Sequence, residues 1–315
     1  MTEQEAREVE HEITVRAPAE DVYRLLAEVE NWPRLFPPSV YVDYAEKNGN
    51  EERIRIWATA NGEAKHWTSR RELDPEGRRI TFWQEVSAPP VARMSGTWII
   101  EPQGPEQTRV RLLHTYRAID DDPEGLAWID RAVDRNSRAE LPALKENLEL
   151  ASLSADLTLS FEDTVRIDGS AKDVFAFINE AQLWTERLPH VHDVTLTEST
   201  PGVQTLRMDT VAKDGSTHTT ESVRVCFPDH RIAYKQTTLP ALMKLHTGYW
   251  QFSEGDDGVT TATSQHTVTV DVENIAKVLG PAAGVAEARA FLREALGTNS
   301  RATLGHAKAF AEARR

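Results

Sequence analysis

Cysteine is almost absent from this chain of 315 residues, in which Cys226 is the single example. One cysteine cannot form an intrachain disulfide or a cysteine-based zinc site, so a packed core must hold the fold together. No apolar run approaches the roughly 18 residues of a membrane span, and the charged first dozen residues lack the apolar segment of a signal peptide. We therefore expect a cytoplasmic protein with no membrane partner.

Positive charge is also scarce. Lys and Arg number 36 against 50 Asp and Glu, a net charge of −14, which argues against nucleic acid and anionic membrane surfaces as partners. No glycine-rich phosphate loop follows a predicted strand, so we expect no nucleotide or flavin cofactor. His190 and His192 lack a third metal ligand at a suitable spacing, and we interpret them as residues of a loop or strand start rather than as a metal site.

The first half of the sequence predicts a mixture of helices and antiparallel strands. Apolar periodicity indicates a strand at 9–16, a helix at 19–28 and a short helix at 32–36. Turn signals such as Asn61-Gly62 divide the next segment into six strands of about ten residues each. A long helix with one apolar stripe follows from about 123 to 150. This is an α+β pattern, and a curved antiparallel sheet around one long helix would leave a cavity for a small ligand.

The pattern then begins again about 152 residues later. The matching features are Trp32 and Trp184, Trp98 and Trp250, His114 and His266, and the tetrapeptide Asn-Ser-Arg-Ala at 136–139 and 299–302. Each copy has the size of a domain, so the repeat predicts two tandem domains, 1–151 and 152–315. Gly280-Pro281 places the start of the last helix near Ala282.

The segment 65–73 reads as a strand with two different faces. Trp67, Ser69 and Arg71 share one side, whereas the other side is wholly polar. Because Trp67 is apolar, we expect this side of the strand to face the interior. Arg71 would then be buried as well, and a buried guanidinium needs a partner. A pocket for an anionic or carbonyl-rich ligand would use such a face. The alternative is an Arg71 that extends to the rim and pairs with a glutamate.

Three further polar residues are expected to face the same interior. His114 alternates with Val110 and Leu112 on one strand face, so it is a candidate for general acid/base chemistry. Asn136 and Glu140 fall on the apolar stripe of the long helix. We expect Glu140 either to pair with Arg71 or to act as a base with a raised pKa.

The second copy has a weaker pattern. Arg224 and Ser222 correspond to Arg71 and Ser69, but Thr220 replaces the tryptophan. The alternate face of that strand is the more apolar one, so periodicity does not by itself send Arg224 inward. His266 does lie on a predicted inward face. On the last helix, the inner stripe is expected to include Asn299, Thr303 and His306.

The sequence resembles the polyketide aromatase/cyclases, START/Bet v 1-like proteins with helix-grip folds. The resemblance rests on Ala17-Pro18, Trp32-Pro33-x-Leu35-Phe36, Trp67-x-Ser69-x-Arg71, a strand containing Trp98, and the helical pair Arg138-Ala139. It covers essentially the whole chain, and the duplicated layout is similar to the di-domain members of type II polyketide synthase systems. It implies two helix-grip domains, each with a curved antiparallel sheet around a long C-terminal helix.

The resemblance also implies roles for individual residues. The family's required arginine and the serine and tryptophan before it fall at Arg71, Ser69 and Trp67. A tyrosine of single-domain members falls at Ser39, with Tyr41 close by, and a helix asparagine falls at Glu140. We expect catalysis to involve Arg71, Ser69, His114, Arg224 and Ser222, and substrate contacts to come from Trp32, Trp67, Tyr41, Asn136, Glu140, Trp184, His266 and Asn299.

The implied activity is cofactor-free cyclisation, dehydration and aromatisation of the first ring, C7–C12, of a ketoreduced poly-β-ketone. The chain would be carried by an acyl carrier protein, with other type II polyketide synthase components as partners. A tandem START-like carrier of hydrophobic ligands is the alternative, because fold does not fix function. The convergent Arg, Ser and His favour the enzyme. We expect a monomer whose two domains pack as a pseudo-dimer.

Overall fold

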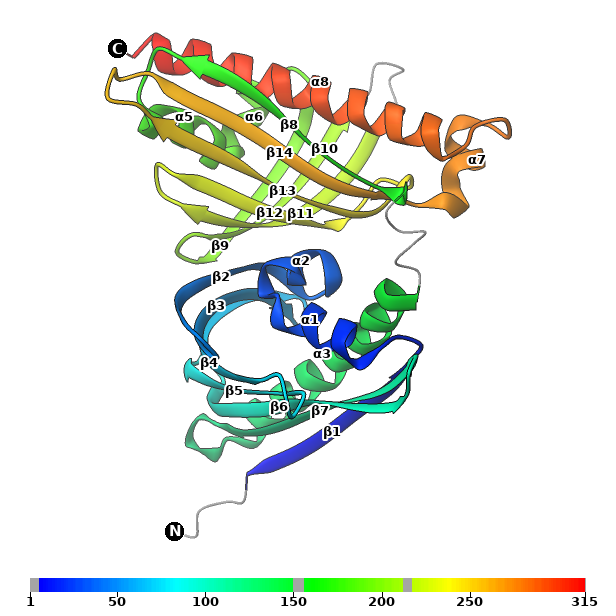
Figure 1. The fold of residues 1–315 in the computed structure, drawn as a ribbon. Helices are drawn as coiled ribbons and strands as arrows, with labels where there is room; N and C mark the ends of the chain where they lie inside the picture. Colours follow the sequence, from blue (N-terminus) through cyan, green and yellow to red (C-terminus); the bar gives the residue numbers. More distant parts are fainter. Residues whose placement is uncertain (1–5, 150–155, 212–216, 315) are drawn as a thin grey trace. The chain divides into compact units, whose positions relative to one another are not determined.

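Figure 1 shows a computed structural model of the chain, which describes residues 6–149, 156–211 and 217–314. The chain divides into two compact units, Met1–Ala151 and Ser152–Arg315. None of the helices in the described part is long and apolar enough to cross a membrane.

The first unit is one antiparallel sheet with a long C-terminal helix. Its seven strands are ordered β1-β7-β6-β5-β4-β3-β2. The elements are β1 (Arg7–Val15), α1 (Ala19–Ala27), η1 (Val29–Asn31), α2 (Trp32–Leu35), β2 (Ser39–Asn48), β3 (Glu51–Ala60), β4 (Glu63–Asp74), β5 (Arg79–Val86), β6 (Val91–Gly104), β7 (Gln107–Ala118), η2 (Ile119–Asp121) and α3 (Pro123–Glu149). The six predicted meander strands and the long helix are confirmed.

Local sequence sets the pairing of the strands that carry the site. Asn61 and Gly62 both have positive φ, 51° and 84°, which suits a two-residue hairpin turn between β3 and β4. The turn fixes the register, so that Ile56 lies opposite Trp67 and Glu52 opposite Arg71. The predicted inward face of β4 is confirmed, since Ser69 and Arg71 are buried and His66 is exposed.

The second unit repeats this architecture with strand order β8-β14-β13-β12-β11-β10-β9. Its elements are β8 (Thr158–Ile167), α5 (Ala171–Asn179), η3 (Ala181–Leu183), α6 (Trp184–Arg187), β9 (Val191–Thr200), β10 (Val203–Val211), β11 (Thr217–Phe227), β12 (Arg231–Thr238), β13 (Met243–Glu254), β14 (Thr260–Val270), η4 (Val272–Asn274), α7 (Ile275–Leu279) and α8 (Val285–Glu312). The predicted tandem α+β fold, a sheet with a long C-terminal helix in each half, is therefore confirmed.

The last helix starts three residues later than predicted. Gly280 ends α7 with a φ of 93°, and α8 begins at Val285 rather than near Ala282. The Glu287 carboxylate accepts a hydrogen bond from the Gly284 backbone N–H at 2.9 Å, which caps the helix at that point. Gly280 and Pro281 stop the preceding helix, but the cap decides where the next one begins.

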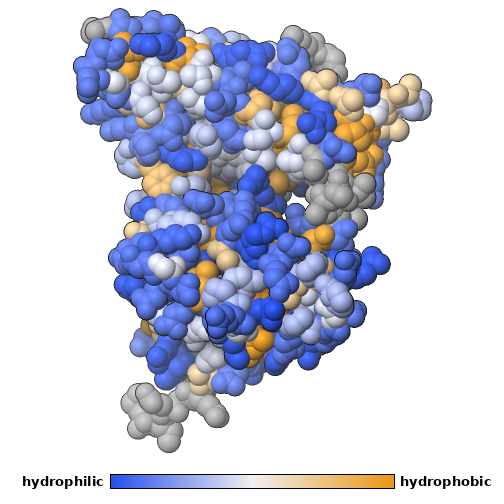
Figure 2. All heavy atoms as spheres, in the orientation of Figure 1, coloured by the Kyte–Doolittle hydropathy of each residue, from blue (hydrophilic) through white to orange (hydrophobic). Residues whose placement is uncertain are grey.

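Each unit has its own core between the sheet and the helices. In the first unit the core includes Leu26 of α1, Ile80 and Trp98 of the sheet, and Leu144 of α3. The visible surface is mostly polar (Figure 2), with one larger group of apolar residues near α7 of the second unit, where Val278 is exposed. The interior of the first unit is incompletely filled, and that space defines the candidate site.

Candidate active site

A cavity of about 140 Å³ lies inside the first unit. Residues of β2 to β7 line it on the sheet side, and α3 lines it on the other. Trp32, Trp67 and Trp128 contribute three indole rings to its wall. Flat aromatic walls suit a planar conjugated ligand, and enclosed apolar cavities with a few polar groups are typical binding sites.

Five of the predicted site residues line this cavity: Trp32, Trp67, His114, Asn136 and Glu140. Two of them are fixed by hydrogen bonds to backbone carbonyls. The indole N–H of Trp32 donates to Leu26 O at 3.2 Å, and the amide of Asn136 donates to Thr59 O at 3.1 Å. Helix α2, the strands and α3 thus bring together residues that are more than 100 positions apart in sequence.

His114 of β7 is a neutral imidazole at physiological pH. Burial lowers its pKa to about 4, and the nearby His11 ring acts in the same direction. Its Nδ1 is buried without a hydrogen-bond partner. The ring of Phe82 meets it edge to face, with centroids 5.6 Å apart. A neutral imidazole beside a cavity can accept a proton from a bound ligand.

Glu140 of α3 is the acidic group of the cavity. Burial raises the pKa of its carboxyl to about 8, so it is protonated at neutral pH. Of the two alternatives drawn from the sequence, burial favours the raised pKa, whereas Arg71 pairs with Glu52 and not with Glu140. The cavity therefore holds a neutral base and a protonated acid.

Arg71 is buried, with 2% of its surface exposed, and each of its three guanidinium nitrogens donates a hydrogen bond. Its Nε donates to the Glu52 carboxylate at 3.1 Å. Its terminal nitrogens donate to Leu26 O at 3.1 Å and Ala27 O at 2.7 Å. Neither Arg71 nor Ser69 is among the described residues that line the cavity.

The guanidinium of Arg71 nevertheless contacts Trp32, which lines the cavity. It lies 5.4 Å from the ring centre of Trp32, whose indole also donates to Leu26 O. Arg71 and Trp32 therefore share one carbonyl acceptor at the end of α1. This arrangement holds the Trp32 ring in place through cation–π attraction and backbone hydrogen bonds.

Tyr41, which was expected to contact substrate, is not among the described residues that line the cavity. Its ring packs on Trp57 at 5.5 Å, and Trp57 stacks on His66, which belongs to the polar face of β4. A register shift between Ser39 and Tyr41 explains the difference. This bulge reverses the alternation of β2, so Ser39 lines the cavity while Tyr41 lies on the opposite face.

Asn299 and His306 were also expected on the inner stripe of the last helix, and both are exposed. The buried stripe of α8 includes Leu292, Ser300 and Leu304. Asn299 lies about 100° around the helix from Ser300 and therefore points away from the sheet. Thr303 is buried, as predicted.

In the second unit Arg224 is buried, with 3% of its surface exposed, although periodicity left its direction open. One terminal nitrogen donates to Ile178 O at 2.7 Å, and the guanidinium lies 5.5 Å from the Trp184 ring centre. Its other terminal nitrogen, Nη1, has no hydrogen-bond partner. Burial lowers the pKa of the Arg224 guanidinium. Ser222 is buried on the same strand.

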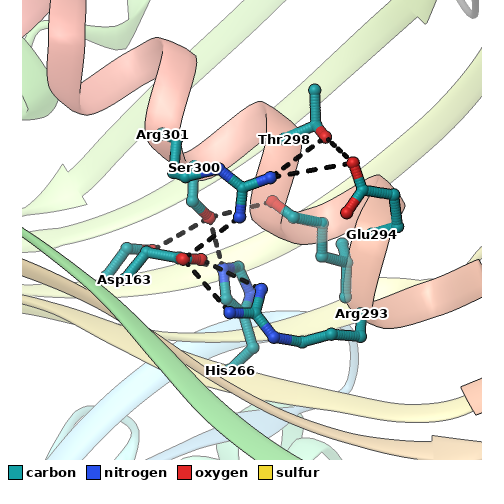
Figure 3. Close-up of polar contacts among 9 residues, drawn as sticks. Asp163, His266, Arg293, Glu294, Thr298, Ser300 and Arg301 are labelled. Atoms are coloured by element: carbon teal, nitrogen blue, oxygen red, sulfur yellow. Dashed lines mark hydrogen bonds and ion pairs between the residues drawn. The ribbon is translucent and has the colours of Figure 1, made fainter. Parts of the chain in front are cut away.

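His266 is buried, as predicted, and belongs to a polar network (Figure 3). Its Nε2 lies 2.6 Å from Ser300 Oγ, and its Nδ1 lies 2.9 Å from both the Tyr234 hydroxyl and His246 Nε2. Burial lowers its pKa to about 4. The polar side chains around His266 thus form hydrogen bonds with one another.

Gln84, Trp128 and Ser137 are cavity residues of the first unit that the sequence analysis did not single out. Gln84 follows Ile80 and Phe82 at alternate positions, so strand periodicity could have found it. Ser137 stands four residues after Val133 on the apolar stripe of α3. Polar residues on apolar faces were the available signal in both places.

Comparison with known proteins places this architecture in a family. The sequence matches the family described as polyketide cyclase / dehydrase and lipid transport twice, over residues 6–149 and 158–312. The chain belongs to that family, with one copy in each unit.

Its relatives include full-length proteins of similar layout. The granaticin polyketide synthase bifunctional cyclase/dehydratase of Streptomyces virginiae is 52% identical over 94% of this chain and 97% of its own length. The actinorhodin polyketide synthase bifunctional cyclase/dehydratase of Streptomyces coelicolor is 45% identical over 96% of both chains.

Two solved structures share the whole fold. The di-domain ARO/CYC BexL from the BE-7585A biosynthetic pathway is 68% identical, with a TM-score of 0.87 over 98% of this chain and 100% of its own. The di-domain ARO/CYC StfQ from the steffimycin pathway is 33% identical, with a TM-score of 0.86 over 97% of this chain and 99% of its own.

Proposed function

We propose that this chain catalyses cyclisation and dehydration of the first ring of an aromatic polyketide. Cyclisation and dehydration are the activities for which its full-length relatives are named. The observation that carries the proposal for this chain is the cavity of the first unit, where a neutral His114 and a protonated Glu140 share aromatic walls.

Ring closure requires a carbon nucleophile. Neutral His114 removes a proton from a methylene between two carbonyls of the bound chain, which gives an enolate and an imidazolium. The enolate carbon attacks a ketone further along the chain, forming the new C–C bond and an alkoxide. The imidazolium returns its proton to that alkoxide, so His114 is neutral and Glu140 is protonated again when the step ends.

Dehydration then uses both groups in their resting states. His114 removes the remaining α-proton, while the Glu140 carboxyl donates its proton to the departing hydroxyl, which leaves as water. The raised pKa keeps this proton available at neutral pH. Loss of water creates the double bond that leads toward the aromatic ring.

The cavity contributes shape as well as proton transfer. Poly-β-ketones cyclise readily, so the main gain comes from folding a flexible chain into one near-attack geometry. Trp32, Trp67 and Trp128 would confine the chain to a plane. We assign Arg71 a positioning role through its contact with Trp32, because its donors are taken by Glu52 and the end of α1.

The finer features of the proposal follow the family resemblance. We propose that the substrate is a ketoreduced chain on an acyl carrier protein, that the first bond joins C7 and C12, and that the protein acts in the cytoplasm. The first unit would carry the chemistry. In the second unit the corresponding polar side chains bind each other, which supports a role in folding or in docking the carrier.

Reconstitution with a minimal synthase and ketoreductase tests the function. Addition of the protein should shift the products from spontaneously cyclised compounds to a single first-ring aromatic product. Arg71→Ala should abolish the shift by releasing Trp32. An unchanged spectrum with the wild-type protein would favour the carrier alternative, in which the same cavity binds a hydrophobic ligand without converting it.

A further inference from the structure

Three side chains beside the cavity of the first unit carry buried polar atoms without a hydrogen-bond partner. They are Gln84 Oε1, His114 Nδ1 and Ser137 Oγ. Buried polar groups in proteins are almost always paired, and an unpaired one costs free energy. Three of them around one cavity point to polar atoms that a ligand supplies.

The second unit has the same three side chains at equivalent positions. Gln236 and His266 follow Gln84 and His114 at an offset of 152, and Ser300 follows Ser137 at the helix offset of 163. The register agrees across the strands, because Gly96 pairs with His114 in one unit and Gly248 pairs with His266 in the other.

In the second unit, however, these side chains have protein partners. Gln236 Oε1 lies 3.0 Å from His246 Nδ1, and because a carbonyl oxygen can only accept, His246 donates. The Tyr234 hydroxyl lies 2.9 Å from His266 Nδ1, and Ser300 Oγ lies 2.6 Å from His266 Nε2. Two side chains, Tyr234 and His246, complete the set.

The first unit lacks both completing groups. Phe82 and Met94 stand where the second unit has Tyr234 and His246, again at an offset of 152. The aromatic ring is seated in the same way in both units, since a Cβ on Gly96 would lie 2.4 Å from Phe82 Cζ and one on Gly248 would lie 2.5 Å from the Tyr234 hydroxyl. Neither Phe82 nor Met94 can donate a hydrogen bond to the unpaired atoms.

The orientation of Gln84 identifies what it needs. Its Nε2 lies 3.4 Å from the sulfur of Met94. A thioether sulfur only accepts, so the N–H end of the amide faces Met94 and the carbonyl oxygen is the free end. That oxygen requires a donor, as Gln236 finds in His246.

We propose that Gln84 is a specificity-determining residue whose Oε1 accepts a hydrogen bond from a hydroxyl of the bound chain. The inference rests on the proposed function and deepens it. A ketone at that position cannot donate, whereas the hydroxyl of a reduced carbon can. A site built around a ligand hydroxyl strongly rejects the analogue that lacks it. His114 Nδ1 and Ser137 are the neighbouring groups that this hydroxyl would meet.

The test compares two chains made by one minimal synthase, with and without its ketoreductase. The readout is the ratio of enzyme-dependent cyclised product from the reduced chain to that from the unreduced chain. The variants are Gln84→Met, which keeps the length but removes the acceptor, and Gln84→Glu, which keeps an acceptor oxygen. Gln84→Leu replaces Gln84→Met if the latter does not fold, and Gln236→Met is the matched change in the second unit.

The wild-type protein should favour the reduced chain, and Gln84→Met should lower the ratio at least tenfold. Gln84→Glu and Gln236→Met should keep the wild-type ratio. A wild-type ratio near one, or an unchanged ratio in Gln84→Met, would overturn the assignment of Gln84. A wild-type protein that alters neither product spectrum would instead refute the proposed function itself.

Discussion

Arg71 and Glu52 form a buried ion pair on adjacent strands, with the Nε of Arg71 donating to the carboxylate at 3.1 Å and both residues at most 3% exposed. Lys47 adds a second cation 3.3 Å from the other oxygen of Glu52. In the second unit, Gln204 occupies the register position opposite Arg224, and its Oε1 is unpaired. One unit therefore places a carboxylate opposite its buried arginine, and the other places an amide there.

Glu52→Gln should destabilise the first unit strongly, because it leaves a buried guanidinium without a counter-charge. Loss of one partner of a buried pair typically costs about 3–5 kcal/mol. Urea unfolding monitored by tryptophan fluorescence measures the change. Glu20→Gln is the control, since it removes an exposed partner of Arg78 and should leave the midpoint unchanged. Equal effects of the two variants would contradict the account.

The reciprocal change, Gln204→Glu combined with Glu198→Gln, should stabilise the second unit. Gln204 Nε2 now donates to the Glu198 carboxylate at 2.8 Å, so the second substitution is needed to avoid two facing carboxylates. The first substitution places a carboxylate opposite Arg224, whose Nη1 lacks a partner. The unfolding midpoint of the second unit should rise, with that of the first unchanged. A fall in the midpoint would show that desolvation of the new carboxylate outweighs the pairing.

The unpaired atoms of the first unit should gain protein partners when Phe82 and Met94 are replaced by the residues of the second unit, tyrosine and histidine, and the site should then be closed to a ligand. Phe82→Tyr combined with Met94→His supplies donors to His114 Nδ1 and Gln84 Oε1, the atoms now unpaired. We expect a higher thermal midpoint and loss of the effect on polyketide products. Tyr234→Phe with His246→Met should instead lower the midpoint and leave the products unchanged. A closed first unit that stays fully active would refute the role of these atoms.

The pH dependence of stability should change with Glu140→Gln. Because folding raises the pKa of this carboxyl from 4.5 to about 8, its stabilising contribution is present below pH 4.5 and is lost as the pH rises through 8. The variant should therefore gain stability relative to the wild type between pH 5 and pH 9. Thermal midpoints across this range measure the gain, and a constant difference would show that Glu140 is not protonated when folded.

Much of the fold could be predicted from the sequence, since the period of the apolar residues and the turn signals set the strands and the long helices. The inward direction of Arg71 followed from strand alternation alone. Its partner did not, although the Asn61-Gly62 turn pairs Glu52 with Arg71 once that turn is taken as the hairpin.

The remaining errors have local causes. Tyr41 left the cavity face because a bulge after Ser39 reverses the alternation of β2, and bulges leave no periodic signal. Asn299 was placed by analogy with Asn136, which lies at the edge of its stripe, where it donates to Thr59 O. Asn299 is exposed, whereas Asn136 is partly buried.

The pH profile of turnover for the wild type and Glu140→Gln tests the central claim most directly. With a neutral His114 of pKa about 4 and a protonated Glu140 of pKa about 8, wild-type activity should fall below pH 4 and above pH 8. Expressing the variant's rate as a fraction of the wild-type rate at each pH cancels the pH dependence of the other components. We predict a variant slower by about 10²–10⁴-fold between pH 5 and pH 7, with the gap narrowing above pH 8 as the wild type loses its acid. A variant with the wild-type rate, or a gap that stays constant through pH 9, would contradict acid catalysis by Glu140.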